Sequence, residues 1–472
     1  MLLTLGGFGV LAPLHRKVAP MARMWLSLPI GAAAYVLIAF LLVLSTGSLR
    51  PGMALMVTGV IGGIGGLSAL WSRGWDRHAV VWGAVAAGLA LVTVLSARSI
   101  HLTRLTPDSL RYLLFSNDLR LNDALAEVHR TDLLLRQIGL PSLHTLSSLT
   151  DQRYMASIGP LFGVFALGFF AWFLCRSTSS MAKWSRWVLV AIAVLFLLTS
   201  NRLLYDAFYI NTHIEVAAYL LVAVAGSWLA VTNKSWEWAV PSGISLGISL
   251  LFRPDMPLVV AVVLIGVAAS RAGWATRLAL AIPPAIVVFL WYGLVLWRRT
   301  PGGDNVSLIA PVFVSLVAVL GAVLVVIVSN SPRVAPLARH VDRIMLGGLL
   351  LLLAVVAVGE PEILVNVTYA TFRNLTYDGL WLFTWPAAIV LTVIAVVVHR
   401  IPDGRLWTTP IVGFTLLFWL LPLIRGGARR VGAGDSGNRI LAHILAVIVA
   451  FLVLAAVDLW PASDENAETV SR

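Results

Sequence analysis

Long apolar stretches follow one another through this sequence, and one long polar segment, residues 98–156, interrupts them. A helix needs about 20 apolar residues to cross the hydrocarbon core of a bilayer. Lipid offers no partner to an open backbone, so such stretches are predicted to be helices. Only 12% of the residues are charged, against about 25% in soluble domains. We therefore expect an all-α polytopic membrane protein whose large outer loop carries interfacial helices.

Fourteen spans are predicted, and three of them are short enough to be broken or re-entrant, which would reduce the count to 12 or 13. The short ones are 187–200, 237–252 and 255–270. The others lie near residues 25–46, 53–71, 79–97, 157–175, 213–232, 278–297, 306–329, 344–358, 379–398, 408–424 and 440–460.

The distribution of Lys and Arg predicts the orientation, because short cytoplasmic loops carry an excess of positive charge. With the N-terminus inside, Lys17, Lys183 and Lys234 all fall on the cytoplasmic side. Both termini are then cytoplasmic, including a disordered tail at 461–472, and segment 98–156 lies outside. The net charge of +12 reflects these loops, so we expect membrane lipids and no nucleic acid as partners. The sequence is rich in Ala, Val, Arg and Trp and has only three lysines. This bias is typical of a high-GC bacterium, so we expect the chain in a bacterial inner membrane.

Asp108 opens the most polar part of the outer segment. Pro107 precedes it, and leucines recur at helical spacing from Ser109 to Leu125, which predicts a helix lying in the membrane interface. Asp108 would stand at the N-terminal end of that helix. Two roles stay open for it: an N-cap of the helix or a general base.

A second carboxylate, Asp206, is predicted to face the same compartment as Asp108. It lies in an outer loop with Tyr205, and His213 begins the next helix. The loop could be an interfacial aromatic belt. Alternatively, Asp206 could join Asp108 in one site, because carboxylates far apart in sequence can converge.

Arginines gather on the outer side, where the charge rule disfavours them. Arg253 lies in a short turn between two apolar spans, and a charge there is costly beside lipid. It could be a snorkelling side chain or a phosphate ligand, since guanidinium matches phosphate oxygens bidentately. Segment 425–439 adds an anion-attracting patch, or alternatively a set of headgroup contacts. Its members are Arg425, Arg429, Arg430 and Arg439, and Arg439 shares a helix face with His443.

Several kinds of site have no signature in the sequence. A glycine-rich phosphate loop, a His-Glu-x-x-His motif and a Cys-x-x-Cys pair are absent, and Cys175 is the single cysteine. We expect no metal, no cofactor and no disulfide within the chain. The polar loop 359–378, which includes Arg373, could contact a sugar.

These features resemble the GT-C superfamily of integral-membrane glycosyltransferases, which take sugars from polyprenyl phosphate carriers. Asp108-Ser-Leu-Arg-Tyr112 is similar to the acidic motif of the family's first outer loop, and Tyr205-Asp206 to its second acidic motif. Arg253-Pro254 is similar to the Arg-Pro pair of lipid-phosphate-mannose-dependent members. Asn438-Arg439-Ile-Leu-Ala-His443 is similar to the segment that opens a late helix.

The resemblance covers roughly residues 79–460, which would form the catalytic module, while residues 1–78 would be accessory helices. The family pattern differs here in three ways: two spans precede the expected first helix, Asp108 has no adjacent acid, and no proline stands near Ala446.

The resemblance implies an inverting transfer of a hexosyl or pentosyl group on the extracytoplasmic face. The donor would be a polyprenyl-phosphate-linked sugar, and the acceptor a cell-envelope glycan, lipid or protein. The implied catalytic residues are Asp108 and Asp206. The implied phosphate ligands are Arg253, Arg429, Arg430 and Arg439. The implied substrate contacts are Tyr112, Tyr205, His213, His443 and Arg373.

Other functions stay open at this point. A polymerase or ligase of lipid-linked glycans would also face outward and carry arginines. A transporter or flippase would show charged or broken helices near the bilayer centre. A non-catalytic scaffold is the remaining alternative.

Overall fold

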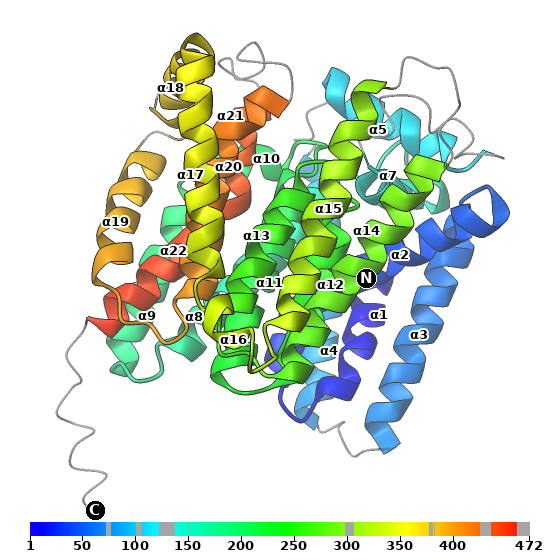
Figure 1. Ribbon diagram of the computed structural model, residues 1–472. Helices are drawn as coiled ribbons and strands as arrows, with labels where there is room; N and C mark the ends of the chain where they lie inside the picture. The colour runs from blue at the N-terminus through cyan, green and yellow to red at the C-terminus, as the bar shows by residue number, and fades with distance from the viewer. Residues whose placement is uncertain are drawn as a thin grey trace, which may run out of the picture.

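The computed structural model describes residues 1–71, 77–100, 106–121, 137–150, 152–297, 306–376, 381, 383–424 and 436–459. All regular structure in these residues is helical, which confirms the α-helical class. In Figure 1 the long helices run roughly side by side. The short helices α5, α10 and α21 gather at one end of this bundle, and α16 lies at the other.

The helices, with their bounds, are α1 (Leu2–Val10), η1 (Ala12–Leu14), α2 (Pro20–Thr46), α3 (Pro51–Trp71), α4 (Arg77–Ile100), α5 (Pro107–Asp118), α7 (Gly139–His144), η2 (Thr145–Leu149), α8 (Ile158–Ser177), α9 (Lys183–Leu198), α10 (Asn201–Ala207), α11 (His213–Thr232), α12 (Trp236–Ser249), α13 (Met256–Ala269), α14 (Trp274–Trp297), α15 (Val306–Val328), α16 (Ala335–Ala338), α17 (Val341–Gly359), α18 (Pro361–Thr376), α19 (Thr384–Val398), α20 (Arg405–Ile424), α21 (Ser436–Ile440) and α22 (Ala442–Asp458).

Eight helices in the described part of the chain are long and apolar enough to cross a membrane. They lie in α2, α3, α4, α8, α11, α14, α17 and the α21–α22 pair. The pair α9 and α10 would be a ninth if it forms one span, and it is bent by 69° at its break. The polytopic architecture thus agrees with the sequence, whereas the count of fourteen is not confirmed. Helices such as α13 and α19, at 14 and 15 residues, are too short to meet the length criterion.

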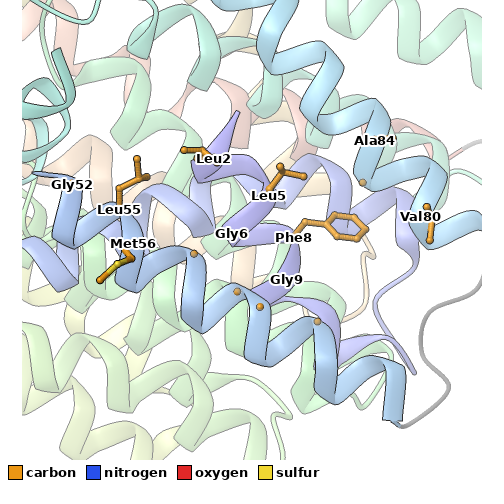
Figure 2. A pocket seen from close by; sticks show the side chains of 15 residues that line it. Leu2, Leu5, Gly6, Phe8, Gly9, Gly52, Leu55, Met56, Val80 and Ala84 are labelled. Carbon is orange, nitrogen blue, oxygen red and sulfur yellow. The ribbon is translucent and has the colours of Figure 1, made fainter. Parts of the chain in front are cut away.

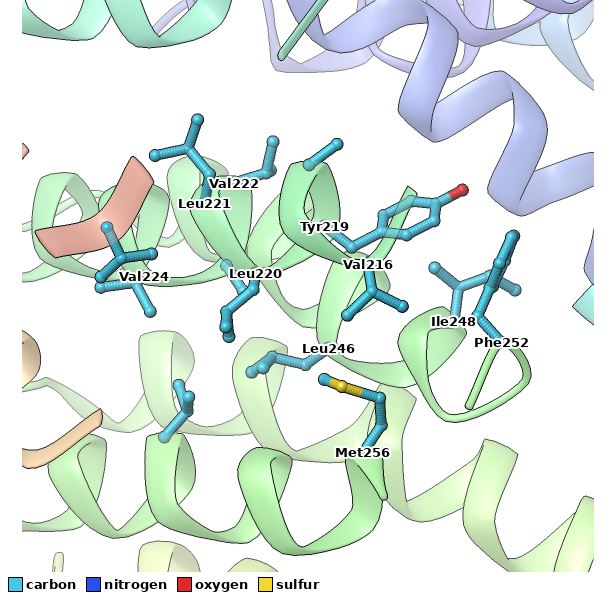
Figure 3. Packing of buried hydrophobic residues seen from close by; sticks show 14 of the residues in the cluster. Val216, Tyr219, Leu220, Leu221, Val222, Val224, Leu246, Ile248, Phe252 and Met256 are labelled. Carbon is cyan, nitrogen blue, oxygen red and sulfur yellow. The ribbon is translucent and has the colours of Figure 1, made fainter. Parts of the chain in front are cut away.

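Helix α11 lies at the centre of the core. Its sequence is apolar on all sides, which is the pattern of a fully buried helix, and 94% of its apolar window is buried. Figure 3 shows its side chains facing those of α12 and α13, with Val216 beside Met256 and Leu220 beside Leu246. At the other side, the Tyr219 hydroxyl donates to the carbonyl of Pro29 in α2 (3.1 Å). Helix α2 therefore packs directly against the predicted catalytic module.

The N-terminal helix α1 is a feature that the apolar-span analysis did not predict, because nine residues cannot cross a bilayer. Glycines let it lie close to α2 and α3, since small residues allow helix backbones to approach in membranes. A Cβ on Gly9 would collide with the backbone of Gly62, and one on Gly7 with the backbone of Ser27. Figure 2 shows the apolar pocket between α1, α3 and α4 that these glycines line in part.

This close packing gives a testable prediction for Gly62. A Cβ at Gly62 would come within 2.6 Å of the carbonyl oxygen of Gly6. Gly62→Ala is expected to destabilise the protein by roughly 1–3 kcal/mol, the usual cost of overpacking. The measurement is thermal unfolding of the detergent-solubilised chain. Gly63→Ala is the matched control, because a Cβ at Gly63 has no neighbour within 4 Å. Equal unfolding midpoints for the two variants would contradict the packing.

Helix α5 differs from the predicted interfacial helix in length and in its buried face. It ends at Asp118, so the helix predicted to reach Leu125 is too long, and residues 122–136 lie outside the described part. Leu110 and Leu114 are exposed, whereas Tyr112 and Phe115 are buried in the core. The protein thus binds α5 through its aromatic side and leaves Leu110 and Leu114 at the surface.

Candidate functional site

Three helices and one turn bring charged residues together at one end of the bundle. The residues are Asp108 on α5, Asp206 on α10, Arg439 on α21 and Arg253 in the turn before α13. We call these four residues the acid–arginine cluster. The bend between α9 and α10 turns α10 away from the direction of the preceding helix. Ser200 caps α10 by accepting from the backbone N–H of Leu203 (3.4 Å).

Asp108 and Arg439 form the outermost contact of the cluster. The Arg439 Nη2 atom lies 3.6 Å from Asp108 Oδ2, and the Asp108 side chain is 37% exposed while that of Arg439 is 10% exposed. The N-cap of α5 is Thr106, whose hydroxyl accepts from the backbone N–H of Ser109. The N-cap role considered for Asp108 is therefore wrong. Asp108 lies in the first turn, where the helix dipole favours a negative charge, and its carboxylate remains accessible.

Tyr209 connects α5 to the arginine of the cluster. Its hydroxyl lies 2.6 Å from Thr106 Oγ1, and its ring lies 5.1 Å beneath the guanidinium of Arg439. The hydroxyl of Ser109 also donates to the carbonyl of Ile210 (3.2 Å). These contacts hold the segment after α10 against α5, and they fix Arg439 beside Asp108 by a cation–π contact.

Asp206 is buried behind this outer pair, with 1% of its surface exposed. Its nearest cation is Arg202, one helical turn earlier, with Nε 3.4 Å from Asp206 Oδ1. The charges of Arg202, Arg439 and Arg253 all act on the Asp206 carboxylate. Neither of its oxygens accepts a hydrogen bond from a described residue. In its ionised form Asp206 attracts these arginines, whereas a substrate in solvent cannot reach the carboxylate in this conformation.

Arg253 and two histidines extend the cluster inward. Arg253 Nε donates to Asp255 (2.9 Å), and its Nη1 lies 3.3 Å from His213 Nε2. His213 and His443 share a hydrogen bond between Nδ1 and Nε2 (2.9 Å), and their rings stack. His443 lies one helical turn after Arg439, on the same side of the segment, as their spacing predicts. Through His213 this side is in contact with Arg253.

The position of Arg439 is also fixed from the other side. The indole N–H of Trp381 donates to the side-chain oxygen of the neighbouring Asn438 (2.9 Å). Trp381 and Asn438 are both fully buried. These contacts fix the position of the short helix α21, and with it the Arg439 guanidinium next to α5.

An apolar cavity of about 240 Å³ adjoins the cluster. Side chains of α8, α9, α10, α11 and α22 line it, and it reaches Ile214 and Ala442, the chain neighbours of the two histidines. Leu198 and Leu204 also line the cavity, and they are 39% and 43% exposed at the outer surface of the protein. The cavity therefore extends from the chain neighbours of the two histidines to the outer surface of the bundle, where lipid would lie.

The remaining sequence-predicted residues have different environments. Tyr112 is buried in the hydrophobic core, so its side chain packs rather than faces solvent. Tyr205 stacks on Tyr209 (5.6 Å between ring centroids), next to the cluster. Arg373 on α18 is exposed, and its guanidinium lies over the ring of Tyr369. Arg425, Arg429 and Arg430 lie outside the described residues.

In the described part of the chain, no three or more His, Cys, Asp or Glu side chains come together in a group that could hold a metal ion. The cations that surround Asp206 are guanidinium groups. The arrangement can bind an anion and remove a proton nearby, since it combines an accessible carboxylate with arginines.

Comparisons with known proteins give one distant structural likeness. No model of a known protein family matches the sequence, and no curated protein matches it. The chain is similar in structure to the oligosaccharyltransferase AglB of the archaeon Archaeoglobus fulgidus, solved in complex with an inhibitory peptide and a dolichol-phosphate. The likeness has 15% identity and a TM-score of 0.40, and it covers 78% of this chain and 50% of AglB. The chain thus spans about half the length of AglB, and a likeness this distant carries no argument about function.

Several residues that shape the cluster were not predicted from the sequence. Thr106 stands directly before Pro107, and a Thr-Pro pair is the usual signature of an N-cap followed by the first helical residue. Arg202 precedes Asp206 by four residues, which is the spacing of an ion pair on a helix. Both signals were therefore present in the sequence. The contact of Tyr209 with Arg439 had no local signal, because it depends on the packing of α5 against α10 and α21.

Proposed function

We propose that this protein is a membrane glycosyltransferase that uses a polyprenyl-phosphate-linked sugar. The observation that carries the proposal is the pairing of an accessible carboxylate, Asp108, with Arg439 at 3.6 Å. A general base and a phosphate ligand are the two groups that this transfer needs. The site would face the extracytoplasmic side of a bacterial inner membrane, and the acceptor would be an envelope glycan, a lipid or a protein.

The transfer begins with the acceptor hydroxyl, which gives its proton to Asp108. The hydroxyl oxygen then forms a bond to the anomeric carbon of the sugar, on the face opposite the phosphate. The bond between that carbon and the phosphate oxygen breaks, and the electron pair leaves with the polyprenyl phosphate. The product is an inverted glycoside, and the leaving group carries one more negative charge than the donor phosphate did.

Arg439 stabilises that developing charge, because its guanidinium presents parallel N–H groups that match phosphate oxygens. The Arg439 guanidinium is held in place before the donor arrives, by the ring of Tyr209 and by the hydrogen bond between Trp381 and the adjacent Asn438. Little reorganisation is therefore needed at the moment of reaction. Arg253 adds positive charge from deeper in the protein, where Asp255 and His213 orient its guanidinium. Asp206 attracts the arginines in its ionised form, and Asp108 acts as the base because it is the carboxylate that an acceptor can reach.

The apolar cavity would hold the first isoprene units of the carrier. It begins beside His213 and His443 and opens at exposed leucines, so a lipid could enter from the side while its phosphate meets the arginines. Its wall is apolar, as an isoprenoid requires.

Ala446 tests this cavity, because it lines the wall on α22. Ala446→Phe is expected to raise the KM for a long-chain donor about tenfold, which corresponds to roughly 1.4 kcal/mol and is typical of overpacking. The kcat is expected to change little, since the reacting groups are untouched. A donor with one or two isoprene units serves as the comparison substrate. Ala456→Phe is the control variant, because Ala456 lies exposed on the same helix.

The direct test of the proposal uses the purified full chain in liposomes. A panel of polyprenyl-phosphate-linked hexoses and pentoses, each with a labelled sugar, is supplied together with a lipid and glycan extract from bacterial envelopes. We expect label to enter one acceptor fraction, with one polyprenyl phosphate released for each sugar transferred. Movement of an intact donor across the bilayer, without any transfer of label, would instead indicate a flippase.

A further inference from the structure

A polar cavity lies at the end of the bundle opposite the acid–arginine cluster. It has a volume of about 840 Å³ and lies where α13, α15 and α19 end and where α20 begins, beside α16. Figure 1 shows α16 at the end away from α5 and α10. Four arginines and one aspartate are among the residues that line it: Arg271, Arg277, Arg339, Arg405 and Asp403.

Hydrogen bonds from the turn before α14 and from α11 to the turn before α20 fix the frame of this cavity. The backbone N–H of Arg271 donates to Asp403 Oδ1 (3.1 Å), and the indole N–H of Trp228 donates to the carbonyl of Pro402 (3.0 Å). Asp403 has a φ of 50°, a left-handed conformation that aspartate tolerates better than most residues. The turn before α14 is therefore joined to the turn before α20, and the cavity has defined walls.

Arg277 places a fixed positive charge in one wall. Its side chain is buried and donates to the carbonyls of Ala272 (2.9 Å) and Ser270 (3.0 Å) near the end of α13, and to that of Val326 (3.3 Å) on α15. Arginine in this position satisfies carbonyls that a helix end leaves without partners. Arg405 is held in turn by Asp342, at 3.6 Å.

Arg271 and Arg339 supply the accessible charge of the cavity. Both side chains are exposed, and neither forms an ion pair within the described residues. His399 adds no charge at neutral pH, because burial lowers its pKa and the nearby Asp458 only partly offsets that effect. Two guanidinium groups with no ion pair among the described residues thus line a cavity whose walls also carry two fixed ones.

We propose that this cavity binds the phosphate-bearing headgroup of an anionic phospholipid. Basic pockets between membrane helices are suited to anionic headgroups, and guanidinium groups match phosphate oxygens bidentately. If this end of the bundle is cytoplasmic, the positive-inside bias alone would account for the presence of arginines there. It would not account for their convergence on one cavity with a hydrogen-bonded frame. A zwitterionic headgroup fits less well, because its own ammonium would meet the arginines.

The test is native mass spectrometry of the full chain in a non-ionic detergent, titrated with phosphatidylglycerol or phosphatidylcholine. We expect phosphatidylglycerol to bind at least about tenfold more tightly. The double variant Arg271→Gln/Arg339→Gln is expected to weaken phosphatidylglycerol binding by about tenfold or more, since one arginine near an anionic headgroup contributes about fivefold and the variant removes two. Gel filtration checks that the variant stays folded.

The matched control is Arg176→Gln/Arg333→Gln, which removes two exposed arginines that do not line the cavity. This variant is expected to bind phosphatidylglycerol as the wild type does. Equal affinity for the two lipids would overturn the proposal, as would an equal loss in the control variant. Displacement of phosphatidylglycerol by millimolar inorganic phosphate would also overturn it, because the ligand would then be free phosphate.

Discussion

Replacing Asp108 by Asn is expected to lower the rate of sugar transfer by about 100- to 10,000-fold, the usual contribution of a general base. Asparagine has nearly the same shape but cannot accept the proton of the acceptor hydroxyl. The loss should appear in kcat, with the KM for the donor changed little. Transfer of label from the polyprenyl-phosphate donor in liposomes measures both parameters.

The fold should survive this substitution, because the Asp108 side chain is 37% exposed and ion pairs at that exposure contribute about 0–1 kcal/mol. Circular dichroism and the unfolding midpoint check this point. Asp118→Asn is the matched control, since Asp118 lies at the other end of the same helix. Asp108→Glu is expected to recover part of the rate. Full activity of the Asn variant would remove Asp108 as the base, and Asp206 would become the carboxylate to test.

The architecture of this chain could be predicted from its sequence to a large extent. Apolar stretches and the low charge content are properties of composition, and lipid permits only helices for such segments. The start of α11 at His213 and the charged turn around Arg253 also agree with the structure. These features depend on residues close together in the chain, which is why a single sequence reveals them.

Other features depend on packing between distant segments. The contact of Asp108 with Arg439 joins α5 to α21, and no local pattern in either segment specifies the other. Helix α1 was missed because its nine residues are too few for a span, and because its glycines each disfavour a helix by about 1 kcal/mol. The close approach of its backbone to Gly31 and Gly62 outweighs that preference. Tertiary contacts thus determine whether a helix forms where local sequence preferences alone do not predict one.

Arg439 gives the second large expected effect. Arg439→Ala should lower the transfer rate by about 100- to 1,000-fold, as is typical when one group that stabilises the transition-state charge is removed. Arg439→Lys keeps the charge but loses the planar pair of donors, so it should recover only part of the rate. The exposed Arg120, close to the end of α5, provides the control variant Arg120→Ala.

Two further readouts separate phosphate binding from a structural role of Arg439. A short-chain prenyl phosphate, which mimics the leaving group, should inhibit the wild type more strongly than Arg439→Ala. Because Arg439 and Asp108 act in the same step, Arg439→Ala in an Asp108→Asn background should cost much less than in the wild type. Two outcomes would contradict a role in phosphate binding. In one, Arg439→Ala loses activity but is inhibited by the prenyl phosphate as strongly as the wild type; in the other, its loss adds fully to that of Asp108→Asn. Either result would mean that Arg439 serves the packing of α21 against Tyr209 and does not bind the leaving phosphate.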